Sequence, residues 1–375
     1  MKRILSTLAL IFLAVTVTSP IARSQTEPPL ISPEVHADHT VTFRFRDPNA
    51  KEVGVRLEGS SKPVPMQKDD QGVWNLTTDP LTPDYYGYAF IADSVVLLDP
   101  SNYRVKPNFL YRSNEVYIPG PPSLSWEIAD VPHGEIHHHF YKSAVVGDQR
   151  DFFVYTPPGY NPSAKQAYPV LYLLHGYSDD ASGWTAVGRA NIILDNLIAQ
   201  GQAKPMIVVM PLGYGEPKVL EPHSGVFHDP EITQRNFDKF REALLTEVIP
   251  KVESAYLVKK DRDSRAIAGL SMGGSESLLT GLNTLDKFSW IGAFSSGITP
   301  EFDKEFPALD SKANQQLHLL WIACGTDDHS IELNRNLRRW LASKSIKHVD
   351  IETPGAHTWM VWRRNLTEFA PLLFR

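Results

Sequence analysis

Apolar runs of strand length alternate with helix-like stretches from about residue 131 to the end of this 375-residue chain. The apolar runs are nearly continuous, as expected of strands buried on both faces of a sheet, and they span residues 169–174, 206–210, 265–269, 290–294 and 317–323. The helix-like stretches span residues 190–200, 237–254, 272–282 and 331–343. This alternation predicts a mostly parallel sheet covered by helices. Two leading strands, near 137–143 and 151–156, are expected to form an antiparallel edge.

The preceding part of the chain has a different pattern, with several short strand candidates separated by turn signals. Val41–Arg46 alternates apolar and polar residues, as a half-buried strand does. Further candidates span residues 52–57, 73–77 and 85–90. We therefore predict a small all-β sandwich over residues 28–118. The proline-rich residues 118–122 form a stiff linker signal, and the second domain is expected to span 126–375.

The first 24 residues have the features of an export signal. Lys2 and Arg3 precede the mostly apolar stretch Ile4–Val17, and Ala22-Arg-Ser24 fits the small-x-small cleavage rule. The apolar run is short for a membrane-spanning helix, which needs about 20 residues. An uncleaved anchor is the alternative interpretation. We expect a secreted or periplasmic bacterial protein with no membrane association after cleavage.

Charge and cysteine content exclude several classes of protein. The formal charge is −6, and loss of three positive charges with residues 1–24 would make it −9, which disfavours nucleic acid and anionic lipid as partners. The single cysteine, Cys324, excludes an internal disulfide. Three adjacent histidines, 137–139, alternate faces on a strand and cannot all bind one metal well, so no metal site is expected.

Gly269-Leu-Ser-Met-Gly273 is the motif that carries chemistry. It follows a predicted strand and opens a predicted helix, which is the context that a nucleophile elbow requires. The glycines allow the tight turn that lifts the Ser271 hydroxyl out of the sheet. The N-terminal end of the following helix favours a developing negative charge. Ser271 is therefore the predicted nucleophile.

A serine hydroxyl needs a base, and in an elbow the chain order is serine, acid, histidine. The histidines after Ser271 are His318, His329, His348 and His357. His357 is the predicted base because it lies in a loop after the last strand, where it could reach the carboxyl edge of the sheet. The others lie in or beside strands or directly after the acid candidates.

The acid is expected after the strand that ends near Cys324. Asp327 and Asp328 both fit. Asp303 and Asp310 are weaker candidates, because the sequence around them is polar and typical of loops. Cys324 itself is more typical of a buried small hydrophobe than of a nucleophile. The backbone N–H groups of Tyr177 and Met272 are predicted to form the oxyanion hole, because Gly176 permits close approach after an early strand.

The second part of the chain resembles carbohydrate esterase family 1, which comprises the feruloyl and acetylxylan esterases of the esterase D-like group. The matching text covers roughly residues 130–375 and comprises Tyr172–Gly176, Trp184, Gly188–Asn191, Leu194–Leu197, Pro205–Pro211, Val248–Pro250, Ala268–Gly274, Gly325–Asp328, Gly355–Trp359 and Trp362. The resemblance implies an α/β-hydrolase fold and a serine carboxylesterase without a cofactor. It selects Asp328 over Asp327 as the acid. His175, Trp184 and Trp359 are expected to line the substrate pocket.

The N-terminal part is similar, at Ser32–Val35, Pro48–Ala50 and Leu98–Pro100, to the early-set immunoglobulin-like modules that precede such esterases. Trp74, Tyr85, Tyr86 and Tyr88 could serve glycan binding, but a buried core is the favoured role for most of them. We therefore expect a structural or substrate-shaping module. The irregular segment Gly213–Thr233 could shape a pocket.

The expected function is hydrolysis of feruloyl or acetyl esters of plant polysaccharide or related small esters. Three alternatives remain at this stage: a siderophore-ester hydrolase, an acyltransferase of the mycolyltransferase type, and a non-catalytic glycan-binding protein.

Overall fold

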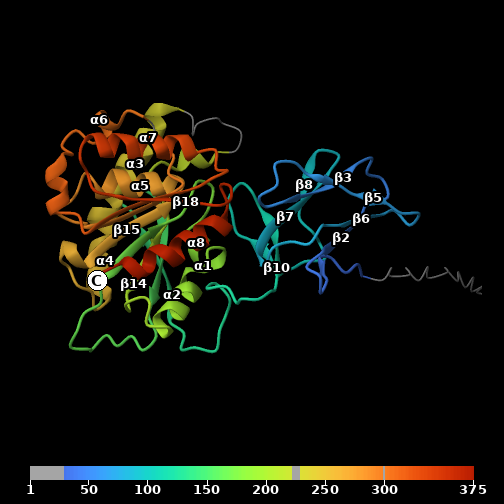
Figure 1. The fold of residues 1–375 in the computed structure, drawn as a ribbon, viewed down its shortest axis with the longest axis horizontal. Coiled ribbons are helices and arrows are strands. Elements are labelled where there is room, and N and C mark those ends of the chain that lie inside the picture. Colours follow the sequence, from blue (N-terminus) through green and yellow to red (C-terminus); the bar gives the residue numbers. More distant parts are fainter. Residues whose placement is uncertain (1–28, 222–228, 299) are drawn as a thin grey trace, which may run out of the picture.

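A mixed sheet of eight strands forms the centre of the larger part of the molecule (Figure 1). The computed structural model describes residues 29–221, 229–298 and 300–375, so the expected leader lies outside the described residues. The strand order across the sheet is β11 (Glu135–Lys142), β12 (Gln149–Thr156), β14 (Ile207–Pro211), β13 (Val170–Leu174), β15 (Arg265–Leu270), β16 (Trp290–Phe294), β17 (Leu319–Gly325) and β18 (Val349–Thr353). The strands from β14 to β18 are parallel, and β11 and β12 form an antiparallel edge as predicted.

Helices cover both faces of this sheet (Figure 1). One face carries α1 (Gly183–Ala186), α2 (Ala190–Ala199) and α8 (Trp359–Phe369). The other carries α3 (Pro230–Ala243), α4 (Ile249–Ala255), α5 (Met272–Gly281) and α7 (Ile331–Ser343). A π-helical turn, Leu244–Val248, joins α3 to α4, so the predicted helix over 237–254 continues through all three. Shorter elements are α6 (Phe302–Glu305) and 3₁₀ turns at Pro217–Leu220, Arg262–Ser264, Ser311–Gln315 and Ala370–Leu372.

An apolar core lies on each face of the central sheet, because successive side chains along a strand point to opposite faces. In β13, Leu171 and Leu173 belong to the core under α2 and α8, whereas Val170, Tyr172 and Leu174 belong to the core under α3 to α7. Every residue of β13 is buried, as the continuous apolar run predicted. The parallel strands consequently end at one common edge, and the loops that follow β13, β15, β17 and β18 lie there.

Residues 34–118 form two antiparallel sheets. The first is β1 (Glu34–Val35), β2 (Val41–Arg46), β6 (Val73–Thr77) and β5 (Gln67–Lys68). The second contains β4 (Val64–Pro65), β3 (Val53–Leu57), β7 (Asp84–Ala92), β10 (Ser113–Ile118) and β9 (Val105–Lys106), with β8 (Val95–Leu97) paired to β7. Trp74, Tyr86 and Tyr88 are buried in the core of this N-terminal module, as favoured by the sequence.

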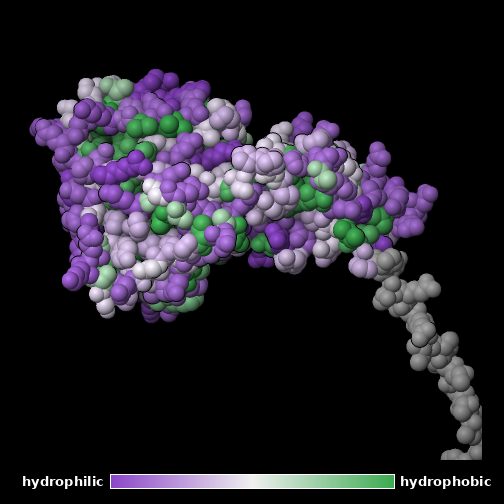
Figure 2. Space-filling view, turned by 60° about the horizontal axis from the view of Figure 1, so that its bottom comes forward, coloured by the Kyte–Doolittle hydropathy of each residue, from purple (hydrophilic) through white to green (hydrophobic). Residues whose placement is uncertain are grey.

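The N-terminal module and the larger part are in direct contact (Figure 2). Tyr85 of β7 packs into the core under α2 and α8, and Met360 of α8 packs against the core of the N-terminal module. Arg363 of α8 donates hydrogen bonds to Asp84 Oδ1 and to the Tyr85 carbonyl, both at 2.8 Å. The two apolar cores therefore interlock through β7 and α8.

The expected irregular segment Gly213–Thr233 is only partly described. Its first part includes the 3₁₀ turn at 217–220, residues 222–228 lie outside the described residues, and α3 already begins at Pro230. Among the helices that the structure describes, none combines the length and the apolar run needed to cross a bilayer.

Candidate active site

Ser271 sits on a sharp turn between β15 and α5. Its backbone has φ 52° and ψ −115°, a conformation that non-glycine residues rarely adopt. A Cβ atom on Gly269 would lie 2.5 Å from the backbone of Gly273, and one on Gly273 would lie 2.4 Å from the His175 carbonyl oxygen. Both positions therefore require glycine, as the predicted elbow geometry demands.

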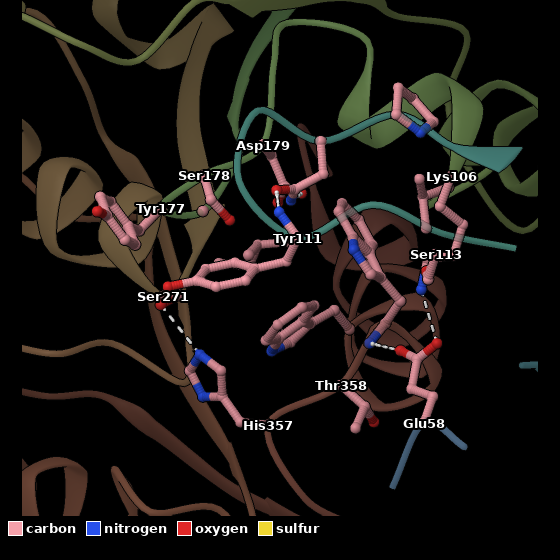
Figure 3. A pocket seen from close by; sticks show the side chains of 17 residues that line it. Glu58, Lys106, Tyr111, Ser113, Tyr177, Ser178, Asp179, Ser271, His357 and Thr358 are labelled. Carbon is pink, nitrogen blue, oxygen red and sulfur yellow. Dashed lines mark hydrogen bonds and ion pairs between the residues drawn. The ribbon is translucent and has the colours of Figure 1, made fainter. Parts of the chain in front are cut away.

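Three side chains from separate loops form one hydrogen-bonded chain at the carboxyl edge of the sheet. His357 Nε2 lies 3.0 Å from Ser271 Oγ (Figure 3), and His357 Nδ1 lies 2.8 Å from Asp328 Oδ2. Because an ionised carboxylate only accepts, Nδ1 carries the proton and Nε2 is free to accept from the hydroxyl. The arrangement can take a proton from Ser271 and hold the resulting charge on the imidazole.

Asp328 contacts the imidazole, whereas Asp327 is exposed. Asp328 is 2% exposed and also accepts from Ser330 N at 2.7 Å. Burial acts to raise the pKa of Asp328, but the hydrogen bond and charge of His357 outweigh it and bring the pKa below its usual value. Asp328 is therefore the anion in the site.

The loop after β13 approaches Ser271 from the other side. A Cβ on Gly176 would lie 2.6 Å from Leu270 Cδ1 and 3.4 Å from Ser271 Cβ, so the backbone of this loop passes close to the hydroxyl. His175 holds the loop in place: its Nε2 accepts from Gly213 N at 2.8 Å and its Nδ1 lies 2.8 Å from the Gly176 carbonyl. Burial lowers the pKa of His175 to about 4, so the ring is neutral.

A pocket with a volume of about 210 Å³ opens over the hydroxyl and the imidazole. Its aromatic lining comes from Tyr111, Tyr177, Trp359 and Trp362. Figure 3 shows the ring of Tyr111 reaching across the pocket toward the Ser271 side. An aromatic pocket that is open to solvent can hold a flat acyl group against the nucleophile.

Two of the predicted pocket residues do not line it. Trp184 is 0% exposed, donates from Nε1 to the Leu174 carbonyl at 2.8 Å and packs edge-on against Trp359. His175 lies behind the loop that it supports. Trp359 does line the pocket. The prediction for His175 and Trp184 is corrected accordingly: both support the wall rather than form it.

Sequence reasoning allowed for a substrate-shaping module but did not identify the residues of the N-terminal module that line this pocket. Glu58, Lys106, Asn108 and Tyr111 line it, about 160 residues or more before Ser271 in the chain. The module also touches the loop after β13, because Phe109 N donates to the Ser178 carbonyl at 2.8 Å and Asn108 Nδ2 donates to Asp179 Oδ1 at 3.0 Å. Tyr111 was the only signal for this contribution in the sequence. It was not sufficient, because it is one aromatic residue among many and its exposure cannot be read from the sequence.

Two other titratable residues near the site, His329 and Glu276, are not part of the hydrogen-bonded series. His329 packs against His357 with ring centroids 4.4 Å apart, and together with Asp328 these residues offer ligand atoms within 4.8 Å of one another. A metal there would compete with the Asp328–His357 hydrogen bond. Glu276 of α5 is fully buried, and burial raises its pKa well above the usual value, so its carboxyl group is neutral.

The three adjacent histidines of β11 have different hydrogen-bond partners. His137 lies near the Thr156 hydroxyl, His138 lies 2.7 Å from Asp151 Oδ2, and His139 contacts the hydroxyl of Tyr256. The alternation along the strand places His138 on the opposite face from His137 and His139, whose rings both pack against Tyr256.

Comparisons with known proteins agree with this geometry. The family described as "Putative esterase" matches residues 143–373. An endo-1,4-beta-xylanase/feruloyl esterase from Xylanibacter ruminicola is 32% identical over 367 residues, which cover 96% of this chain and 47% of that protein. The chain thus spans about half the length of that relative.

Two solved structures share the fold. A ferulic acid esterase from Anaeromyces mucronatus superposes with a TM-score of 0.58 at 25% identity, covering 68% of this chain and 96% of its own. The enterochelin esterase from Shigella flexneri gives a TM-score of 0.67 at 18% identity, covering 90% and 93%. The second likeness concerns the fold alone and extends over most of both parts of the chain. The family match covers more than half of the chain, and this chain therefore belongs to the esterase family.

Proposed function

We propose that the chain is a serine carboxylesterase that cleaves acyl esters through an acyl-enzyme. The observation that carries the proposal is the hydrogen-bonded series of Ser271, His357 and Asp328 beneath an open pocket. His357 accepts the Ser271 proton as the hydroxyl oxygen attacks the ester carbonyl carbon. The protonated imidazole then donates its proton to the alcohol oxygen as the ester C–O bond breaks, and an acyl-enzyme remains on Ser271. In the second step the neutral imidazole takes a proton from water, the water oxygen attacks the acyl carbon, and the proton passes to Ser271 Oγ as the carboxylic acid leaves.

The oxyanion that forms in both steps needs hydrogen-bond donors. We assign this role to the backbone N–H groups of Tyr177 and Met272. Met272 is the first residue of α5, where the N–H groups point away from the helix. The close approach of Gly176 to Ser271 supports the assignment of Tyr177. Loss of one such donor typically costs about 3–4 kcal/mol of transition-state stabilisation.

Feruloyl or acetyl esters of plant polysaccharide, or related small esters, are the proposed substrates. The aromatic residues Tyr111, Trp359 and Trp362 around the hydroxyl suit a planar aromatic acyl group. The names of the Xylanibacter and Anaeromyces relatives, which both include feruloyl or ferulic acid esterase, point the same way. No step in the proposed cycle uses a metal or an organic cofactor.

The N-terminal module is proposed to be an immunoglobulin-like sandwich that shapes the substrate site. Its two sheets enclose one apolar core, and Glu58, Lys106, Asn108 and Tyr111 reach the pocket. Most of its large aromatic residues are buried, which argues for shaping rather than independent glycan binding. The leader-like residues 1–24 support export to the periplasm or beyond.

A substrate panel tests the proposal. Purified protein is assayed with methyl ferulate, acetylated xylan and p-nitrophenyl acetate, and with a catecholate siderophore ester. Turnover of the first three supports the proposal, and preference for the siderophore ester would replace it with the alternative activity. Products are compared with and without an added sugar acceptor, because acyl transfer to the sugar would contradict hydrolysis.

A further inference from the structure

The helix that follows the base residue lacks a cap of its own. Thr358 stands at the N-cap position of α8, directly after His357, but its side chain makes no capping hydrogen bond. Its hydroxyl oxygen is buried without a partner among the described residues. The first N–H groups of a helix need acceptors from elsewhere, and the usual source is the N-cap side chain. For α8 that source is missing.

Glu58 of the N-terminal module supplies the acceptor. Its Oε1 accepts from Trp359 N, the first residue of α8, at 3.0 Å, across 301 positions of sequence. Its Oε2 accepts from Lys106 Nζ at 2.7 Å (Figure 3). The same oxygen accepts from Gly87 N at 2.7 Å. The carboxylate is therefore held by its own module and presented to the end of the helix.

The charge of Glu58 is maintained in this buried position. Burial acts to raise the pKa of Glu58, but the positive charges of Lys106 and Arg363 and the hydrogen bonds to the carboxylate bring it below its usual value. An anion at a helix N-terminus interacts favourably with the helix dipole.

The position of α8 in turn determines where the imidazole lies. Trp362 of this helix packs edge-on against His357, with ring centroids 4.9 Å apart, and donates from Nε1 to Ser295 Oγ at 3.1 Å. Only Thr358 separates His357 from the residue that Glu58 holds. A shift of the first turn of α8 would therefore move the base relative to Ser271 and Asp328.

We propose that Glu58 is a positioning residue for the base His357, so that the N-terminal module is part of the catalytic apparatus and not an appended domain. The inference rests on the proposed function. Glu58 does not touch the reacting atoms in this role. It acts by fixing the first turn of α8 through Trp359 N.

The test compares Glu58→Ala with a matched control on the same helix. Arg364→Ala removes the 3.3 Å contact between Arg364 and Asp84 Oδ2, which also joins α8 to the N-terminal module but lies further from the base. We expect Glu58→Ala to lower kcat for p-nitrophenyl acetate about 10- to 100-fold with KM changed less than about threefold, because small misplacement of a reacting group has effects of this size. Arg364→Ala is expected to retain kcat within about twofold, since most surface substitutions have small effects.

Chemical rescue separates positioning from general stability. Formate can occupy the space left in Glu58→Ala and accept from Trp359 N, so added sodium formate is expected to restore part of kcat, whereas sodium chloride at equal ionic strength is not. Formate is expected to leave Arg364→Ala unchanged. A Glu58→Ala protein with a lowered melting temperature but unchanged kcat would show a purely structural role and overturn the inference. If this variant does not fold, Glu58→Gln, which keeps the side-chain volume, is measured in its place with the same criterion on kcat.

The rate of Ser271 sulfonylation by phenylmethylsulfonyl fluoride serves as a second readout that needs no ester substrate. Wild-type protein that hydrolyses no ester but is labelled at Ser271 would contradict the proposed function and leave the inference testable through labelling rates. Equal labelling rates in wild type and Glu58→Ala would contradict the inference alone. A slower rate in Glu58→Ala than in Arg364→Ala is the expected result.

Discussion

The Nδ1 atom of His357 lies within hydrogen-bond distance of both carboxylate oxygens of Asp328, 3.0 Å from Oδ1 and 2.8 Å from Oδ2. Oδ1 also accepts from Ser330 N, so the carboxylate is held on its far side by the backbone. The ring is thereby oriented before any substrate arrives, with Nε2 facing Ser271. Pre-orientation of this kind avoids reorganisation during the reaction.

Replacement of Asp328 tests this relationship directly. Asp328→Asn is expected to lower kcat by about 10⁴-fold, because an amide favours the wrong imidazole tautomer. Asp327→Asn makes the same chemical change at an exposed neighbour and is expected to lower kcat less than about threefold. Steady-state kinetics with p-nitrophenyl acetate measure both. The opposite ranking would assign the acid role to Asp327.

Removal of the Ser271 hydroxyl is expected to abolish ester hydrolysis. Ser271→Ala loses the attacking atom, and loss of a serine nucleophile lowers kcat by about 10⁶-fold in comparable enzymes. Circular dichroism and the melting temperature serve as controls for folding. Turnover close to that of the wild type would exclude Ser271 as the nucleophile.

The elbow glycines can be tested through stability. A Cβ on Gly273 would lie 2.4 Å from the His175 oxygen and 2.6 Å from the Leu174 oxygen, and both are backbone atoms that cannot yield easily. Gly273→Ala is expected to destabilise the protein by about 1–3 kcal/mol, as overpacking does. At Gly297 the nearest atom to an added Cβ is Ser275 Oγ at 3.9 Å, so Gly297→Ala is expected to cost less than about 0.5 kcal/mol. Urea denaturation measures both, and equal costs would contradict the geometry of the turn.

Asp179, which lies in the loop after β13, makes stability depend on pH. Burial is the main cause that raises the pKa of Asp179 from 3.8 to about 7. The unfolded carboxyl ionises near 4, so the folded state retains its proton and loses stability as pH rises from about 4 to about 7. Asp179→Asn keeps an oxygen for Asn108 and removes this titration.

The measurement is the difference in unfolding free energy between wild type and Asp179→Asn as a function of pH. We expect wild type to lose about 2–4 kcal/mol relative to the variant between pH 4 and pH 7, with a constant difference above. A difference that stays flat over this pH range would show that the Asp179 carboxyl ionises normally.

Tyr111 is expected to favour aromatic acyl groups. Its ring lines the pocket, so Tyr111→Ala is expected to raise KM for methyl ferulate about 3- to 10-fold, the equivalent of one aromatic contact, and to change KM for p-nitrophenyl acetate less. Tyr103→Ala removes a tyrosine of the same module that is 88% exposed and outside this pocket. Equal effects of the two changes on methyl ferulate would exclude Tyr111 from acyl selection.

The sequence predicted many of the long elements because burial has a period that the chain must follow, but it did not predict the 11-residue helix α8 or the six-residue strand β10. The strands of the central sheet and helices α2, α5 and α7 lie within a residue or two of their predicted ranges. Strands β4 and β5 of the N-terminal module were missed because each has two residues and all four are exposed, so no apolar pattern marks them.

The site was predictable where it depends on chain order and strand ends. Ser271, Asp328 and His357 each follow a strand of the parallel sheet, whose carboxyl ends share one edge. The orientation of Trp184 depends on contacts with Leu174, Phe294 and Trp359, and the last two are distant in the chain. The contact between Glu58 and Trp359 depends on how two separately patterned parts pack together. No local period encodes that packing.

The contact between Arg363 and Asp84 has a consequence for any attempt to exchange the leading module. Both side chains are 1% exposed, and each belongs to a different part of the chain. A shortened protein that starts at residue 126 would keep a guanidinium group without its carboxylate, at a cost of about 3–5 kcal/mol if it stayed buried. A foreign module could replace the native one only if it offered acidic side chains at the same two places along the last long helix. The part of the chain that would have to be exchanged as one unit therefore extends beyond the boundary at the proline-rich residues 118–122.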